Sequence, residues 1–260
     1  LYDRMMTREL RSRHMGRYLI GSVIGRGGMG VVYKAWDQQL DRTCAMKVIR
    51  ADKVDDMASV RERFDREARK TSQLQDANVI EVYDYGENVS GDLFYVMAYL
   101  EGLDILKMVR RSGPVDPERV IHLAKQACSA LGGAHRRGLV HLDIKPANLF
   151  VTQQEDNPDF LKVLDFGLVR AIARQRMADV SLVRRIRELE PEEDWRGEVS
   201  RIEESGELGG FEGTPAYAAP EQIEGAATDE RSDIYALGGV MYFMLTGEAP
   251  FIEANQLALM

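Results

Sequence analysis

Short apolar runs bounded by glycine and polar residues dominate the chain up to about Leu100, a pattern typical of strands. The strand-like runs are residues 18–24, 31–35, 43–49, 79–85 and 93–97. A glycine-dense turn separates the first two runs, which predicts a hairpin. Over residues 58–75, apolar positions instead recur at three- and four-residue spacing, the period of a helix. We therefore expect a small antiparallel sheet accompanied by one main helix.

The pattern becomes helical after Gly102. Asp116 and Pro117 form a typical helix start, because a capping carboxylate is followed by proline in the first turn. This helix should end at Gly138, since glycine is favoured just beyond a helix end. Another, largely apolar helix is predicted over 228–246. The fold class predicted is thus α+β, with a small β lobe followed by a larger, mainly α lobe.

Composition refines these boundaries. Residues 1–15 are polar and arginine-rich and predict a flexible lead-in. The β lobe should cover 16–97 and the α lobe 98–260, with the last helices of that lobe missing. An insertion at about 171–212 carries seven basic and eleven acidic side chains. It is interpreted as a solvated, partly disordered loop, the alternative being order around a short apolar stripe before Pro191.

The net charge of −8 over 260 residues disfavours nucleic-acid binding, which usually requires a basic surface. The two cysteines, Cys44 and Cys128, lack metal-ligand spacing and predict core residues in a reducing, cytoplasmic setting. No run approaches the roughly 18 apolar residues of a membrane helix, and the N-terminus lacks a signal-peptide pattern. Because Leu1 replaces the usual Met and a helical pattern continues to Met260, we expect a piece of a longer protein. A membrane anchor beyond either end would not be visible in this sequence.

The segment HLDIKPANLF at 141–150, followed by Asp165, carries the most specific chemistry of the chain. Asp143 is a candidate proton acceptor for an attacking hydroxyl, and Lys145 is a candidate cation for a transferred phosphate. Asn148 and Asp165 offer the oxygen ligands that Mg²⁺ prefers. Each residue alone is also typical of a solvated loop or turn. Their joint spacing favours phosphoryl transfer.

The run GRGGMGVV at 25–32 is a glycine-rich turn between strand-like segments. It is typical of a plain hairpin turn, of a dinucleotide site or of a flap over phosphates. Because β-type residues rather than a helix follow, the flap is preferred to a dinucleotide site. Lys47, in the middle of a predicted strand, is either a solvent-facing edge residue or the partner of Glu67. In the second case the pair would hold the α- and β-phosphates of a nucleotide.

Taken together, these motifs resemble those of protein kinases, closest to the bacterial eukaryotic-like Ser/Thr kinases, from Gly21 to Phe251. The resemblance implies a two-lobe kinase fold, ATP with Mg²⁺ or Mn²⁺, and Ser/Thr hydroxyls of protein substrates as acceptors. It also allows dimerisation through the small lobe. The catalytic residues implied are Asp143, Lys145, Lys47 and Glu67, with Asn148 and Asp165 as metal ligands. The nucleotide contacts implied are Ile24, Gly25, Gly27, Gly30, Val32, Ala45, Lys47, Met97, Tyr99, Leu100, Asp104 and Phe150.

The resemblance further implies several supporting roles. Residues 213–221 should seat the substrate peptide. Asp233 should brace the catalytic loop from below, although a helix-start aspartate is also a simple cap. Phe150 should lie under the adenine, although it would serve equally as ordinary core. Glu221 should lack its usual arginine partner, because the chain ends soon after Phe251, and a buried unpaired carboxylate would cost roughly 3–5 kcal/mol.

Leu142 stands where many kinases have an arginine that binds a phosphorylated activation loop. Leucine cannot make the charge-assisted bonds of such a clamp. The hydroxyls of the predicted activation segment before Thr214 are Ser181, Ser200 and Ser205. We therefore predict a kinase whose activation does not depend on activation-loop phosphorylation. A pseudokinase is disfavoured by the complete catalytic set, and a small-molecule kinase by Lys145 and the peptide-seating segment.

Overall fold

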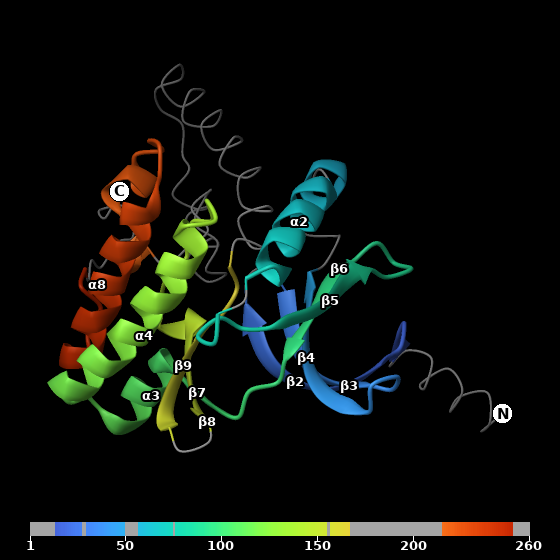
Figure 1. Ribbon diagram of the computed structural model, residues 1–260, viewed down its shortest axis with the longest axis horizontal. Helices are drawn as coiled ribbons and strands as arrows, with labels where there is room; N and C mark the ends of the chain where they lie inside the picture. Colours follow the sequence, from blue (N-terminus) through green and yellow to red (C-terminus); the bar gives the residue numbers. More distant parts are fainter. Residues whose placement is uncertain are drawn as a thin grey trace, which may run out of the picture. The chain divides into compact units, whose positions relative to one another are not determined.

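The computed structural model describes residues 14–27, 30–49, 57–74, 76–154, 157–166 and 215–251 (Figure 1). The chain divides into two compact units. The first unit contains the chain up to Ser72 and Glu81–Leu100, and the second contains Gln73–Ile80 and the chain from Glu101 onward. Strands dominate the first unit and helices the second, so the α+β prediction is confirmed.

An antiparallel sheet with the strand order β1-β2-β3-β4-β6-β5 forms the first unit. Its strands are β1 (His14–Met15), β2 (Tyr18–Gly27), β3 (Gly30–Asp37), β4 (Arg42–Ile49), β5 (Val82–Glu87) and β6 (Leu93–Ala98). The predicted hairpin is confirmed, because β2 pairs with β3 up to Gly27 and Gly30. A Cβ atom on Gly30 would lie 2.1 Å from the carbonyl oxygen of Val48, so only glycine allows β3 to approach β4 this closely.

Different groups bury the two faces of this sheet, since successive side chains of a strand point to opposite sides. One face carries a cluster of Tyr18, Ala35, Cys44, Met46, Val48 and Val96. Helix α2 (Met57–Ser72) packs against the opposite face and lies beside β5 (Figure 1). The fully buried ring of Phe64 lies with its centroid 6.2 Å from that of Tyr85 and 6.4 Å from that of Tyr95. These aromatic contacts fix α2 on the sheet.

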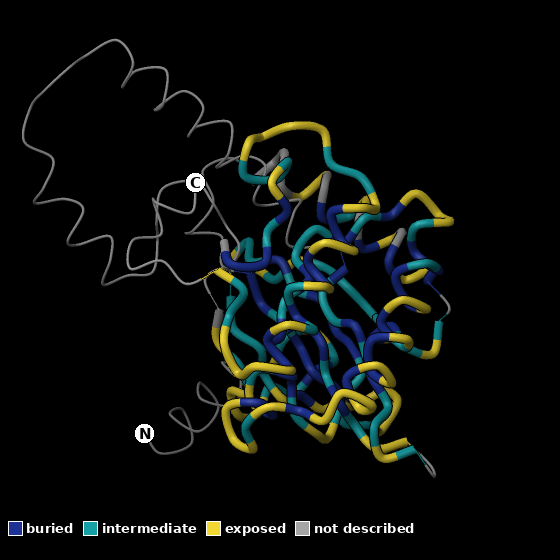
Figure 2. The backbone as a smooth tube through the Cα atoms, turned by 90° about the vertical axis from the view of Figure 1, so that its left-hand side faces the viewer, coloured by how far each residue is buried: buried dark blue, intermediate teal, exposed yellow. Residues whose placement is uncertain are grey.

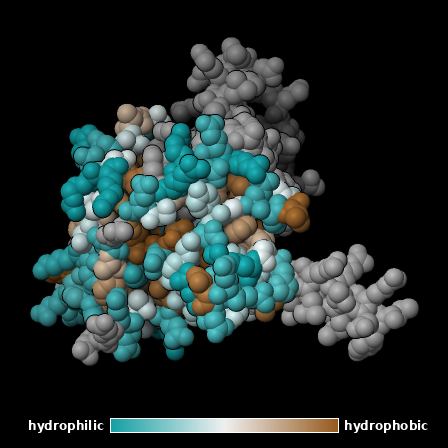
Figure 3. All heavy atoms as spheres, turned by 45° about the vertical axis from the view of Figure 1, so that its right-hand side comes forward, coloured by the Kyte–Doolittle hydropathy of each residue, from teal (hydrophilic) through white to brown (hydrophobic). Residues whose placement is uncertain are grey.

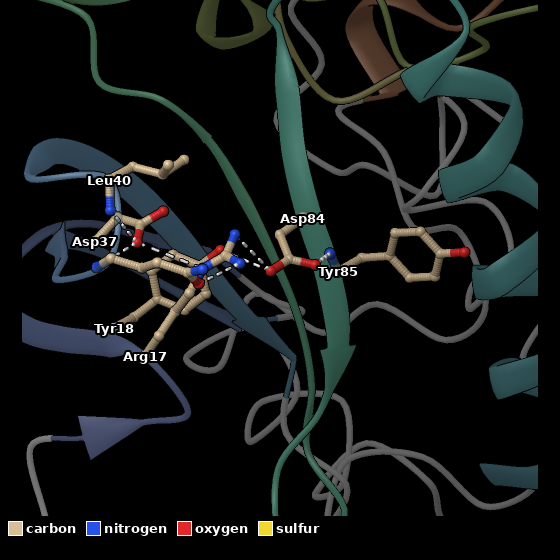
Figure 4. Close-up of polar contacts among 7 residues, drawn as sticks. Arg17, Tyr18, Asp37, Leu40, Asp84 and Tyr85 are labelled. Carbon is tan, nitrogen blue, oxygen red and sulfur yellow. Dashed lines mark hydrogen bonds and ion pairs between the residues drawn. The ribbon is translucent and has the colours of Figure 1, made fainter.

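A charged network joins three strands of the first unit (Figure 4). Arg17 Nε lies 3.4 Å from Asp37 at the end of β3, and Arg17 Nη2 lies 3.1 Å from Asp84 of β5. The Tyr18 hydroxyl donates to Asp84 at 2.6 Å; burial, and then this bond, raise the pKa of Tyr18. Asp37 is only 1% exposed and also accepts the backbone N–H of Leu40 at 3.2 Å. The network therefore ties the start of β2, the end of β3 and β5 together.

Helices α3 (Ile105–Ser112), α4 (Pro117–His135), α7 (Pro220–Ile223) and α8 (Glu230–Thr246) belong to the second unit. With them are the short turns η2 (Pro146–Asn148) and η3 (Pro215–Tyr217), and a sheet of β7 (Gly102–Asp104), β8 (Leu149–Gln154) and β9 (Asn157–Val163). Asp116 caps α4 as predicted, accepting the N–H of Glu118 at 2.9 Å. Helices α4 and α8 pack together (Figure 1), and their buried side chains share one core with β8 and β9. Figure 2 shows the buried stretches of the described chain in dark blue.

Parts of this arrangement differ from the prediction. Residues 73–80 were predicted to lie in the first lobe but belong to the second unit. Their backbone pairs with β9: Val79 forms a bridge with Val163, and Ile80 donates its N–H to the Val163 carbonyl at 2.9 Å. The strand predicted over 79–85 consequently begins only at Val82. Helix α3 and the sheet of β7, β8 and β9 were not predicted.

The surface of the described residues carries both hydrophilic and apolar side chains. Hydrophilic side chains cover most of the face shown in Figure 3, with small groups of apolar side chains between them. Among the described residues, no helix has both the length and the apolar character required to cross a membrane.

Replacing Asp37 by Ala should lower the free energy of unfolding by about 1–3 kcal/mol, because it removes a buried acceptor of several hydrogen bonds. The donors lost are the N–H groups of Gln39 and Leu40, in addition to the Arg17 guanidinium. Asp37→Asn keeps an oxygen that can accept the N–H groups of the turn, so it should lower the free energy of unfolding by less. Urea titration of the two variants checks this, and equal losses would contradict the proposed role of the turn bonds.

Candidate active site

Asp233 of α8 holds the loop that carries the predicted catalytic residues. It is fully buried, and its Oδ2 accepts the backbone N–H of His141 at 2.8 Å while its Oδ1 accepts that of Leu142 at 2.7 Å. His135, the last residue of α4, places Nε2 2.8 Å from the same Oδ2. The helix cap of α8 is Asp229 instead. The predicted brace by Asp233 is therefore confirmed.

The imidazole of His141 joins the two segments that carry the predicted acidic residues. Its Nδ1 accepts the backbone N–H of Asp143 at 3.2 Å, and its Nε2–H donates to the carbonyl of Leu164 at 2.8 Å. The partners fix this assignment of donor and acceptor, because an N–H and a carbonyl have only one role each. The ring also lies 4.7 Å, between centroids, from the ring of Phe166. His141 is buried and was not predicted as a site residue.

The structure brings Asp143, Lys145 and Asn148 together. Lys145 Nζ lies 3.0 Å from Asp143 Oδ1 and 2.8 Å from Oδ2. The amide of Asn148 donates both to Asp143 Oδ2 at 2.9 Å and to the Asp143 backbone carbonyl at 2.8 Å. The Asp143 side chain keeps 18% of its surface exposed. This carboxylate is therefore held in place by two donors and remains accessible.

The predicted metal ligands Asn148 and Asp165 come from two segments that are linked by a backbone hydrogen bond. Leu164 donates its N–H to the Asn148 carbonyl at 2.9 Å, which links Asn148 to the segment leading into Asp165. Asp165 has a positive φ of 58°, an uncommon conformation for a residue with a side chain. Among the described residues, no three His, Cys, Asp or Glu side chains cluster around a common point. The side chains of Asn148 and Asp165 offer the amide and carboxylate oxygens that Mg²⁺ accepts besides water and phosphate oxygens.

Gln126 of α4 supports β9, the strand that ends shortly before Asp165. Its side-chain oxygen accepts the N–H of Leu161 and the amide of Asn78, both at 3.0 Å. Its own amide donates to the carbonyl of Asp159 at 2.8 Å. The role of this glutamine was not predicted, although a polar residue beside the buried Leu123, Ala127 and Ala130 was a detectable signal.

The predicted nucleotide contacts of the first unit lie on neighbouring strands. In the register of the sheet, the paired residues are Gly25 with Val32, Gly27 with Gly30, Val32 with Lys47, and Ala45 with Met97. Ile24 is exposed in β2, and Tyr99 and Leu100 follow the end of β6. Lys47 Nζ lies 5.8 Å from the centroid of the Tyr95 ring, hence on the face that α2 covers. Glu67 lies in α2, and its side chain is outside the described part.

Two predicted nucleotide contacts belong to the second unit, where Asp104 of β7 pairs with Phe150 of β8. Asp104 caps α3, because its Oδ1 accepts the N–H of Lys107 at 2.8 Å while its Oδ2 lies 2.6 Å from Lys107 Nζ. Phe150 is half-buried. A structural role for Asp104 is thus established, and its predicted contact with a ribose stays a prediction.

Glu221 is not left unpaired, because a partner other than the expected arginine contacts it. The hydroxyl of Ser232, in the first turn of α8, donates to Glu221, and this bond lowers the pKa of the carboxyl group. The Glu221 side chain is also only half-buried. The predicted penalty for an unpaired buried carboxylate therefore does not apply to this residue.

The chain is similar in sequence and in fold to known proteins. The family model described as protein kinase domain matches residues 18–186 and 194–260. Serine/threonine-protein kinase Pkn3 of Myxococcus xanthus is 36% identical over 235 residues, which cover 90% of this chain and 38% of that protein. PknB of Mycolicibacterium smegmatis is 37% identical over 246 residues, covering 94% of this chain and 34% of that protein. The crystal structure of the Mycobacterium tuberculosis PknI kinase domain aligns with a TM-score of 0.66 at 25% identity, covering 93% of this chain and 78% of that one.

Replacing Gln126 by Leu should lower the free energy of unfolding by about 1–3 kcal/mol, because the N–H of the fully buried Leu161 and the amide of Asn78 lose their acceptor. The neighbouring Lys125 is exposed, so Lys125→Leu is a matched control that should change stability by no more than about 0.5 kcal/mol. Chemical denaturation measures both. Equal effects of the two variants would show that the Gln126 bonds contribute nothing specific.

Proposed function

The chain belongs to the protein kinase domain family, and on that basis we propose that it is a Ser/Thr protein kinase of bacterial signalling. The chain spans only part of the length of these relatives: the aligned region covers 38% of Pkn3 and 34% of PknB. The observation that supports the activity most directly is the joint positioning of Asp143, Lys145 and Asn148.

In the proposed reaction, a serine or threonine oxygen of a protein substrate attacks the γ-phosphorus of ATP. The bond from that phosphorus to the bridging oxygen of ADP breaks, and the hydroxyl proton passes to Asp143. Lys145, which contacts Asp143 at 2.8 Å, would neutralise charge on the transferred group. Asn148 and Asp165 would hold Mg²⁺, which neutralises phosphate charge when bound.

The first unit would bind the nucleotide. Lys47, with Glu67 as its partner, would hold the α- and β-phosphates, and the glycine-rich turn of β2 and β3 would cover them. Met97 and the residues that follow β6 would contact the adenine. This assignment is supported by the strand register, which places Val32 beside Lys47. Dimerisation through this unit and a cytoplasmic location stay predictions.

Control of the proposed activity involves Leu142. Its backbone N–H is held by Asp233, and its half-buried side chain offers no charge to a phosphate. We also propose that activation does not require phosphorylation of the activation loop. The serines concerned, Ser181, Ser200 and Ser205, lie outside the described residues.

Asp143→Asn should lower the turnover of peptide phosphorylation by about 10²–10⁴-fold, because an amide cannot accept the proton. The measurement is transfer from labelled ATP with Mg²⁺ to serine- and threonine-containing proteins, with mapping of the phosphorylated sites. Glu118→Gln, at an exposed position of α4, is the control and should behave normally. Near-normal turnover of Asp143→Asn would remove Asp143 from the mechanism, and absence of transfer by the unchanged protein would overturn the proposed function.

The combined replacement of Ser181, Ser200 and Ser205 by Ala should leave the rate of transfer within about twofold, in line with surface substitutions that touch no specific contact. The assay compares this variant with the unchanged protein before and after phosphatase treatment, and Lys47→Met provides the inactive reference. Loss of activity in the triple variant would contradict activation without loop phosphorylation.

A further inference from the structure

The peptide groups of Leu142 are held by side chains from two other elements of the second unit. Leu142 has a positive φ of 61°, which is uncommon for a residue with a branched side chain. Its N–H donates to Asp233 of α8 at 2.7 Å, and its carbonyl accepts the side-chain amide of Gln222, from α7, at 2.9 Å. An uncommon backbone conformation persists only where surrounding contacts enforce it. Here those contacts directly precede Asp143.

Gln222 is committed to this contact at both ends of its amide. The side-chain oxygen accepts the backbone N–H of Ala219 at 3.2 Å, while the nitrogen donates to Leu142. Because Ala219 offers a donor and Leu142 an acceptor, only one orientation of the amide satisfies both. Gln222 thus caps α7 and contacts the catalytic loop at once.

Helix α7 is itself attached to α8. Glu221, next to Gln222, accepts the hydroxyl of the fully buried Ser232, which directly precedes Asp233 in the chain. The contacts therefore form a closed ring: Leu142 to Gln222, along α7 to Glu221, to Ser232, and through Asp233 back to Leu142. We define this ring as the Leu142 clamp. It joins the end of the predicted peptide-seating segment to the residue before Asp143.

We propose that Gln222 is a positioning residue, which holds the Leu142 carbonyl so that Asp143 is oriented for proton transfer. This rests on the proposed function. The clamp provides a link between the peptide-seating segment and the catalytic loop that needs no phosphate. It would account for the ordered conformation of the catalytic loop, although Leu142 has no charged group that could bind a phosphate.

Gln222→Glu tests the clamp with minimal change in shape. The introduced carboxylate still accepts the Ala219 N–H, but it cannot donate to the Leu142 carbonyl. The kcat of phosphorylation should fall about 10-fold, or more if Asp143 moves by as much as 1 Å. The KM for ATP should be unchanged, since no clamp residue is assigned to the nucleotide. Glu224→Gln, an exposed position just after α7, is the matched control and should leave kcat unchanged.

A pH profile separates positioning from general destabilisation. Once protonated, the introduced carboxyl group regains an O–H donor for Leu142 while its other oxygen still accepts from Ala219. The ratio of kcat between Gln222→Glu and the unchanged protein should therefore rise as the pH falls from about 8 toward about 5. Asp143, Glu221 and Asp233 are present in both proteins, so this ratio reports on the introduced carboxyl group. A kcat that is unchanged at every pH, or a loss that does not vary with pH, would overturn the proposal.

Amide hydrogen exchange tests the clamp independently of catalysis. Peptides covering residues 140–145 should exchange about 10-fold faster in Gln222→Glu than in the unchanged protein, because the loop opens more often. Peptides of α4 should be unaffected. Equal exchange of the loop in both proteins would overturn the clamp even if the chain transfers no phosphate. Absence of transfer by the unchanged protein would overturn the proposed function alone.

Discussion

The buried carboxylate of Asp233 is the interaction on which the candidate site depends. A charge without solvent contact is tolerated only when its oxygens are occupied by donors, and Asp233 receives the N–H groups of His141 and Leu142 and the imidazole of His135. Satisfying this charge therefore dictates the path of the loop between α4 and η2. The conformation that presents Asp143 is thus a consequence of satisfying a charge in the core.

Much of the fold followed from the sequence, because strands and capped helices have local signals. Asp116 and Pro117 marked the start of α4, and the glycine-rich turn marked the hairpin of β2 and β3. The segment containing Asn78 was misplaced because its partners are remote: Asn78 bonds to Leu161, 83 positions away. Helix α3 was not predicted, because it is short and follows β7 directly.

The candidate site could be predicted where a residue's chemistry is tied to its position in a motif, as for Asp143, Lys145 and Asn148. The residues that hold them were harder to find. Gln126 and Gln222 contribute hydrogen bonds to backbone groups, and a glutamine in a helix usually reads as an exposed residue. Their importance depends on which carbonyl or N–H faces them, and that is set by tertiary packing. A single sequence contains little information about such pairings.

The contacts of the catalytic loop also have a temporal consequence. The residues that hold Leu142 follow it by 91 positions in the case of Asp233 and by 80 in the case of Gln222. Contacts of such large sequence separation cost more loop-closure entropy than local contacts and therefore form more slowly. On the ribosome, where synthesis proceeds from the N-terminus, the loop is translated well before either partner. A nascent chain consequently carries its acidic residues without their final geometry, and it acquires a defined site only once α8 has emerged and packed.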